Sequence, residues 1–174
     1  MEQKNETIAQ QNIVELHLPR YNEIPDVGLF LEQTVRLVNG YLSALEGFDL
    51  TNSMVSNYVK QKIIAPPVKK LYHREQIARL LFLAVAKSIL SLENIQQFFV
   101  LQTEHYPLET AYNYFCDEFE NIWQFVRGNK VTLDEIGTDA PDAKHLLKNM
   151  IFTVVYKNYL VSYLNRLGKP AEDT

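Results

Sequence analysis

Apolar residues recur three and four positions apart along most of this chain, which is the spacing of one face of an α-helix. The first clear run begins after Asp26, which we expect to be the N-cap, and ends at Gly47. Its apolar positions are Leu31, Val35, Val38, Tyr41, Leu42 and Leu45. This pattern predicts a helix between residues 26 and 47.

A second, shorter helix is predicted from Thr51, a suitable N-cap, to about Gln61. Its two faces differ sharply in polarity. One face carries Met54, Val55, Tyr58 and Val59, and the other carries Asn52, Ser53, Ser56, Asn57 and Lys60. The pair Pro66-Pro67 prevents the helix from continuing, and Val68–Tyr72 is expected to be a short extended segment or turn.

Four further helices are predicted, so the fold class is expected to be all-α. The first, over residues 74–89, is apolar on almost every side and should lie at the centre of the core. A helix capped by Ser91 follows and ends before Pro107, where another begins and runs to Gly128. The last helix, about 141–168, would be roughly 40 Å long.

Composition and the first residues indicate a protein of the cytoplasm. Cys116 is the only cysteine, which excludes an intramolecular disulfide or a cysteine cage for zinc and fits a reducing compartment. The N-terminus has no apolar run of the kind found in signal peptides. The most apolar stretch, Ile77–Val85, is far shorter than the roughly 20 residues of a membrane span. We therefore expect no membrane association.

Charge is distributed unevenly along the chain. The net charge of −4 alone disfavours a nucleic-acid partner, because binding a polyanion requires positive potential. Residues 51–74, however, hold Lys60, Lys62, Lys69, Lys70 and Arg74 and no Asp or Glu. This segment has the composition of a nucleic-acid-binding surface, although a solvated basic surface without a partner is the alternative.

The short two-sided helix has the chemistry needed to bind duplex DNA. A helix that enters the major groove presents small polar and cationic side chains, and Asn, Ser and Lys contact base edges or phosphates. The candidate DNA-binding residues are Asn52, Ser53, Ser56, Asn57, Lys60, Lys69, Lys70, Tyr72 and Arg74. For Tyr58 and Tyr72, packing in the core is the favoured alternative to base contact.

The order of parts over Met54–Phe99 resembles the DNA-binding half of mercury-resistance-regulator (MerR) proteins. A short helix is followed by Lys62-Ile63-Ile64-Ala65-Pro66, a basic wing and helices near Arg74 and Ser91-Leu92-Glu93. The stretch Thr51–Phe99 resembles still more closely an uncharacterised bacterial domain-of-unknown-function family, number 1836, and this likeness extends into the first helix. The resemblance implies a MerR-like winged helix-turn-helix with additional C-terminal helices, acting as a DNA-binding transcription regulator.

Several positions depart from the MerR pattern. Where those proteins have an arginine and two tyrosines, this chain has Ser56, Asn57 and Tyr58. In the wing, Lys70 and Tyr72 keep the cation and the second tyrosine, whereas Lys62 replaces the usual glycine. The cysteines of the metal-sensing members are missing, so no metal effector is expected.

The resemblance also implies a division of the chain. We expect residues 1–25 to form a partly ordered N-terminal arm, residues 26–104 to form the DNA-binding domain, and residues 107–168 to mediate dimerisation or effector sensing. A homodimer is expected because one recognition helix reads only a few base pairs and specificity normally requires two half-sites.

No catalytic chemistry stands out, and we expect neither an enzyme nor a cofactor or metal site. The four histidines are scattered, and a single Asp142–His145 pair at helical spacing does not make a metal site. The acidic group Asp117, Glu118 and Glu120 is expected to be a solvated helix face, and Cys116 an inert thiol. Two functional alternatives remain: a protein-interaction module on the same scaffold, and a small-molecule sensor.

The sensor alternative depends on a run of aromatic residues near the C-terminal part of the chain. The run comprises Tyr106, Tyr112, Tyr114, Phe115, Phe119, Trp123 and Phe125. Ligand pockets are commonly lined by such residues. Core or dimer packing is the favoured interpretation.

Overall fold

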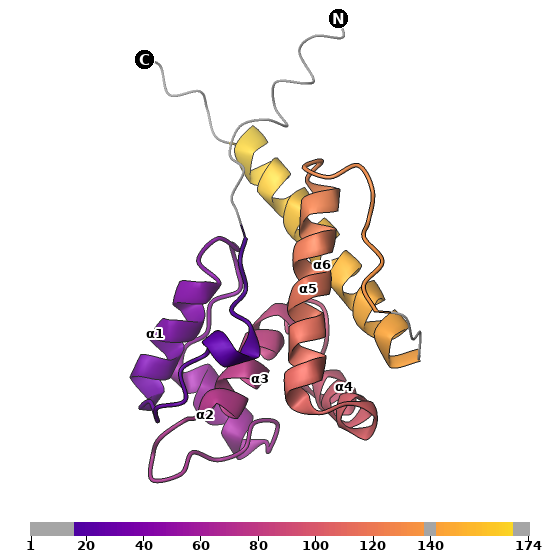
Figure 1. Ribbon diagram of the computed structural model, residues 1–174. Coiled ribbons are helices and arrows are strands. Elements are labelled where there is room, and N and C mark those ends of the chain that lie inside the picture. Colours follow the sequence, from indigo (N-terminus) through magenta and orange to yellow (C-terminus); the bar gives the residue numbers. More distant parts are fainter. Residues whose placement is uncertain (1–15, 138–141, 169–174) are drawn as a thin grey trace, which may run out of the picture.

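The computed structural model describes residues 16–137 and 142–168 and is built from α-helices (Figure 1). The elements are η1 Tyr21–Glu23, α1 Leu31–Tyr41, α2 Asn52–Lys60, α3 Arg74–Ala86, α4 Leu92–His105, α5 Leu108–Val126 and α6 Asp142–Leu167. Extended pairing among the described residues is confined to two isolated antiparallel bridges, Leu29 with Tyr72 and Val68 with Leu71. The all-α prediction is confirmed.

Helix α3 forms the centre of the core, as its apolar sequence predicts. Ten of its thirteen residues are buried, and it packs against α1, α5 and α6. The Phe82 ring contacts the rings of Phe98, Phe99 and Phe115 at centroid distances of 5.5, 5.4 and 5.1 Å. Because Phe115 belongs to α5, the same hydrophobic core extends across the boundary expected between residues 104 and 107.

The described part of the expected N-terminal arm, residues 16–25, packs against α5. Leu18 and Ile24 are buried in the core, and the Leu18 amide donates to Glu120 Oε1 at 2.8 Å. Arg20 donates to both Glu120 oxygens, at 2.9 and 2.8 Å. The remainder of the arm, residues 1–15, lies outside the described residues.

The expectation that the acidic group on α5 is a solvated face is wrong for two of its members. Glu120 is held by Arg20 and by the Leu18 amide. Glu118 is buried, and its Oε1 accepts a hydrogen bond from the Tyr114 hydroxyl at 2.9 Å. Sequence alone could not show this, because the partner segments lie about 100 residues away or on another turn of the helix.

Two of the three predicted N-cap residues are confirmed. Thr51 and Ser91 each cap their helix, accepting from the amides of Met54 and Asn94 at 3.2 Å. Asp26 is not an N-cap: α1 begins at Leu31, because Leu29 exchanges backbone hydrogen bonds with Tyr72 at 2.9 and 2.8 Å and is extended. The expected start of the last helix, Pro141, lies outside the described residues.

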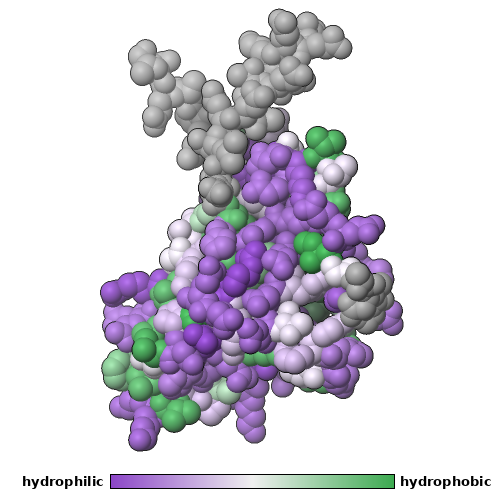
Figure 2. Space-filling view, in the orientation of Figure 1, coloured by the Kyte–Doolittle hydropathy of each residue, from purple (hydrophilic) through white to green (hydrophobic). Residues whose placement is uncertain are grey.

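Helices α5 and α6 pack along each other, and both contact α3. The loop after α5 returns along the molecule, so the two helices run in the same general direction (Figure 1). The Arg127 guanidinium lies 4.0 Å from the Trp123 ring centroid and donates to Asn158 Oδ1 of α6 at 3.4 Å. The face shown in Figure 2 is mainly hydrophilic with small separate hydrophobic patches. Among the described helices, none has the length and apolar character needed to span a membrane.

Candidate nucleic-acid interface

Helix α2 separates its buried and exposed residues as the sequence predicts. Val55 and Tyr58 are buried against the core, and Tyr58 is thereby confirmed as a packing residue. The polar residues Asn52, Ser53, Ser56, Asn57 and Lys60 are all exposed. At about 100° of rotation per residue they fall within an arc of about 140°, so they form one continuous polar face. The Asn57 side-chain oxygen accepts from Gln61 Nε2 at 3.1 Å, which orients its amide.

The C-terminus of α2 is closed by a left-handed residue, Lys62. Its amide donates to Val59 O at 3.0 Å, and the Ile63 amide donates to Tyr58 O at 2.9 Å, which is the Schellman arrangement. Lys62 has φ of 60°, a conformation usually adopted by glycine at this position. The turn therefore keeps the geometry that favours glycine while an exposed lysine occupies it.

Residues Val68–Leu71 form a tight hairpin, called here the basic hairpin, with two lysines at its tip. Val68 and Leu71 exchange backbone hydrogen bonds at 3.0 and 2.9 Å. Lys69 and Lys70 have φ of 50° and 67°, as in a type I′ turn. Both side chains are exposed. The extended or turned segment predicted at 68–72 is confirmed.

Lys62, Lys69 and Lys70 are the only non-glycine residues with positive φ in the described ranges. A left-handed conformation costs about 1–2 kcal/mol for a residue with a Cβ, and Asn-Gly is the usual choice in a type I′ turn. All three strained positions lie in the acid-free segment and all carry exposed cations. Strain retained in this way clusters at functional sites.

Two contacts fix the basic hairpin relative to α2 and α3. The side chain of Gln76 is buried, accepts from the His73 amide at 2.8 Å and donates to the carbonyls of Ala65 and Pro66 at 3.0 Å. The bridge between Leu29 and Tyr72 anchors the other end. Helix α2 and the loop that follows it both lie at the lower left of Figure 1. The sequence analysis did not identify this role of Gln76. The one sequence feature that indicates it is a glutamine at the third position of a helix, where its side chain can bind the backbone before the helix.

Two predicted site residues, one buried and one partly buried, are engaged in contacts within the protein and do not belong to the fully exposed face. Tyr72 is 4% exposed, and burial raises the pKa of its hydroxyl. The Arg74 Nε donates to Ile24 O at 2.8 Å, and its guanidinium lies 4.0 Å from Asp26 and 5.7 Å from the Tyr21 ring centroid. The structure thus exposes the seven other candidates and gives Tyr72 and Arg74 internal contacts.

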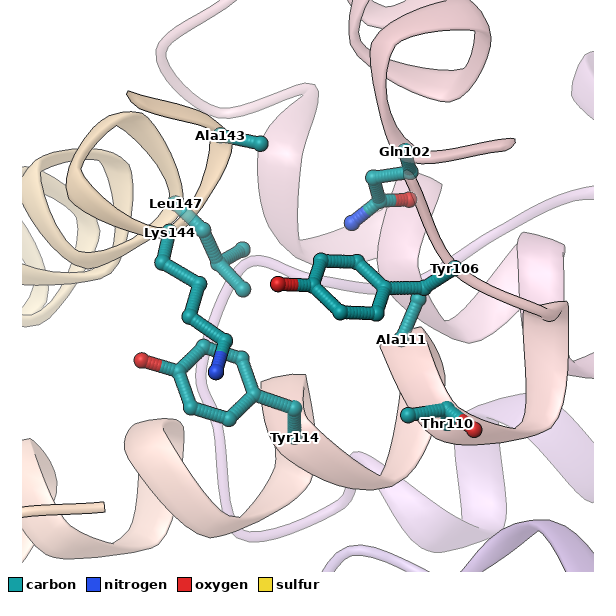
Figure 3. A pocket seen from close by; sticks show the side chains of 8 residues that line it. All are labelled: Gln102, Tyr106, Thr110, Ala111, Tyr114, Ala143, Lys144 and Leu147. Atoms are coloured by element: carbon teal, nitrogen blue, oxygen red, sulfur yellow. The ribbon is translucent and has the colours of Figure 1, made fainter. Parts of the chain in front are cut away.

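Six of the seven residues of the aromatic run divide into core and pocket residues, whereas Phe125 is half-buried and belongs to neither group. Tyr112, Phe115, Phe119 and Trp123 are buried in the core. Tyr106 and Tyr114 instead line a pocket of about 170 Å³ between α4, α5 and α6 (Figure 3). Lys144 Nζ lies 4.6 Å from the Tyr114 ring centroid and 5.5 Å from that of Tyr106. The remaining lining residues are Gln102, Thr110, Ala111, Ala143 and Leu147.

Cys116 is fully buried, with its Sγ 3.6 Å from Pro19 O. Burial raises the pKa of the thiol to about 12, so a thiolate does not form near neutral pH. In the part of the chain that the structure describes, no three His, Cys, Asp or Glu side chains come together as metal ligands would.

Comparisons with known proteins give one match. The family model described as "Domain of unknown function (DUF1836)" matches residues 19–115. Neither the search of curated proteins nor that of solved structures found a significant match. The matched residues begin at the segment that packs on α5, include α2, the basic hairpin and the buried helix α3, and end within α5. The chain therefore belongs to the DUF1836 family.

Proposed function

We propose that this protein is a transcription regulator that binds duplex DNA through a MerR-like winged helix-turn-helix, with α2 as the recognition helix and the basic hairpin as the wing. The observation that carries this proposal is the three lysines kept in left-handed conformations within a segment without acidic residues. Backbone strain that a fold retains tends to cluster at functional sites, and each of these strained residues is also an exposed cation.

The polar face of α2 has the size and chemistry of a major-groove surface. Asn52 and Asn57 carry the amide that pairs with the N6 and N7 atoms of adenine. Ser53 and Ser56 are short hydroxyl side chains that suit contact with bases or phosphates. Lys60, at the last turn of α2, and the two lysines of the basic hairpin are exposed cations that would neutralise phosphates.

The internal contacts of Tyr72 and Arg74 give these residues a positioning role in the proposal. Tyr72 fixes the basic hairpin through its backbone pairing with Leu29. Arg74 ties the start of α3 to the Ile24 carbonyl. Because Gln76 clamps the preceding turn as well, the hairpin is held in place before DNA binds, which lowers the ordering cost of association.

The proposal includes a cytoplasmic location and a homodimer on a two-fold DNA site. One short recognition helix contacts only a few base pairs, and two copies related by a two-fold axis double the contacts. The protein as a whole carries a net charge of −4, so the proposed attraction to DNA depends on the cations clustered in residues 51–74.

Charge reversal on individual lysines tests the proposal. The protein is expected to select defined sequences from a pool of random duplexes. Each of Lys60→Glu, Lys69→Glu and Lys70→Glu is expected to weaken binding to a selected duplex, and the triple variant to abolish it. Arg36→Glu on α1 is the matched control, because Arg36 is also exposed but lies outside residues 51–74. Unchanged affinity of the triple variant would refute the proposal.

Salt dependence separates DNA binding from the alternative of a protein-interaction module. Release of counterions makes log Kobs fall with log salt by about 0.9 for each phosphate contacted. A steep slope for a duplex supports the proposal. A specific protein partner bound through α2 with a shallow slope, and no duplex selected, would favour the alternative.

The pocket in Figure 3 favours a second candidate function, small-molecule sensing. Its two tyrosine rings and Lys144 suit a small aromatic anion. With benzoate as the probe, a rise in Tm that depends on concentration is expected. No shift at millimolar benzoate would count against a site of this chemistry.

A further inference from the structure

Arg127, the residue that follows α5, is a partly buried cation without a carboxylate partner. Its guanidinium lies 4.0 Å from the Trp123 ring centroid, and one of its terminal nitrogens donates to Asn158 Oδ1 at 3.4 Å. Its Nε atom is buried and has no hydrogen-bond partner. None of the ion pairs within the described ranges, 16–137 and 142–168, includes Arg127. Because buried charges are normally paired, keeping this one unpaired lowers stability.

Arg166, near the C-terminus of α6, is a second arginine in the same region, and its side chain is exposed. The C-terminal parts of α5 and α6 lie beside each other (Figure 1). Burial, and after it repulsion from the nearby Arg166, lowers the pKa of Arg127. Arg166 forms no ion pair with a described residue, and residues 143–168 contain no Asp or Glu that could neutralise either cation. Arg127 and Arg166, called here the arginine pair, are therefore a concentration of positive charge without a counter-ion.

Both guanidinium groups are oriented by contacts that leave their charge intact. Asn158 is buried, and its Nδ2 atom donates to Glu46 O at 3.2 Å, which fixes the amide with Oδ1 towards Arg127. The ring of Trp123, only 1% exposed, supports the same guanidinium through a cation–π contact. The Arg166 guanidinium lies 5.9 Å from the Tyr163 ring centroid. Neither aromatic contact consumes an N–H donor, so most of the five donors of each arginine are left for a ligand.

We infer that the arginine pair binds the phosphate group of a small phosphorylated ligand. A phosphate monoester carries nearly two negative charges at neutral pH and three strong acceptor oxygens, so it matches two guanidinium groups in charge and in number of donors. The planar fork of an arginine binds two oxygens of such a group at once. A carboxylate, with one charge and two oxygens, would satisfy only one member of the pair.

The arginine pair is separate from the two sites considered under the proposed function. It lies outside residues 51–74, which hold the candidate DNA-binding residues. The pocket in Figure 3 is lined by residues from the first turns of α5 and α6, among them Thr110 and Lys144. Arg166 follows Lys144 by 22 residues, which is about 33 Å along a helix. The inference therefore does not depend on DNA binding or on the aromatic pocket.

Trp123 provides the test, because it is the only tryptophan of the chain and contacts Arg127. Titration of the full chain with inorganic phosphate, at ionic strength held constant with sodium chloride, is expected to change the Trp123 fluorescence until saturation. Calorimetry of the same titration should give the same Kd. Arg166→Gln is expected to weaken binding at least about tenfold, because it removes one charge-assisted partner and does not touch Trp123.

Arg36→Gln is the matched control, because Arg36 is an exposed arginine on α1 and its loss should leave phosphate affinity unchanged. Circular dichroism checks that both variants keep their helices. The inference is wrong if phosphate gives neither a saturable fluorescence change nor a heat of binding. It is equally wrong if Arg166→Gln and Arg36→Gln bind phosphate as tightly as the wild type.

Two further probes identify the source of the phosphate group, because the exposed Leu164 and Leu167 beside Arg166 also suit a lipid. Glycerol phosphate, a soluble monoester, is expected to bind at least as tightly as inorganic phosphate and to lose affinity in Arg166→Gln. Co-sedimentation with phosphatidylglycerol vesicles and no response to glycerol phosphate would assign the group to a membrane lipid and contradict a small ligand. A protein that binds phosphate but selects no duplex would count against the proposed function only.

Discussion

The backbone of Gly28 lies against the side chain of Leu71, so closely that a Cβ atom added at Gly28 would come 2.8 Å from the Leu71 Cβ. Leu71 closes the basic hairpin, and Leu29, next to Gly28, pairs with Tyr72. Gly28→Ala is therefore expected to push the hairpin away and to lower the free energy of unfolding by about 1–3 kcal/mol. Urea denaturation measures this change. A stability equal to that of the wild type would show that the hairpin adjusts without cost.

Gly40→Ala is the matched control for that variant. Gly40 lies within α1, and a Cβ atom added there meets no other atom within 4 Å. Because glycine is unfavourable inside a helix, alanine is expected to raise the free energy of unfolding by about 0.5–1 kcal/mol. The two substitutions thus have opposite expected signs, although each adds one methyl group.

Replacing the tip of the basic hairpin should separate stability from DNA binding. Lys69→Asn with Lys70→Gly installs the residues that a type I′ turn favours, so the free energy of unfolding is expected to rise by about 1 kcal/mol. Loss of two phosphate contacts is expected to reduce the slope of log Kobs against log salt by about 2. A more stable variant with an unchanged slope would show that the tip lysines do not contact DNA.

Glu120 is expected to be the most important acidic residue for attachment of the N-terminal segment. Glu120→Ala removes the partner of the Leu18 amide and of the Arg20 guanidinium, which are only partly exposed, and should destabilise the protein by about 2 kcal/mol. Asp117, 2.9 Å from Arg20 but more exposed, provides the comparison, and Asp117→Ala should cost less than about 1 kcal/mol. Equal losses of stability for the two variants in thermal unfolding would show that Glu120 contributes no more than Asp117 to the attachment of the N-terminal segment.

The buried thiol of Cys116 should report on global unfolding. Its pKa is raised to about 12, so almost none of it is the reactive thiolate at pH 8. Alkylation by iodoacetamide is therefore expected to be slow in the native protein and fast in denaturant, where the pKa returns towards about 8.5. Rapid alkylation at pH 8 without denaturant would show that α5 opens locally.

Local chemistry in the sequence was enough to place most of the helices. Thr51 and Ser91 cap α2 and α4 because their side-chain oxygens accept hydrogen bonds from backbone amides three residues later in the chain. Such local contacts need no tertiary partner. The almost wholly apolar sequence of α3 likewise required burial on several sides, whatever surrounded it. The two-sided pattern of α2 was predictable for the same reason.

Tertiary structure decided which polar groups remain at the surface. Asp26 has the side chain of an N-cap, yet the pairing of Leu29 with Tyr72 starts α1 five residues later. Glu120 and Arg74 look like solvated charges in the sequence, but Arg20 and the Ile24 carbonyl bind them from distant segments. A sequence pattern predicts interactions between residues that are close in the chain, but not those between distant segments. The left-handed lysines became visible only once the backbone path was known.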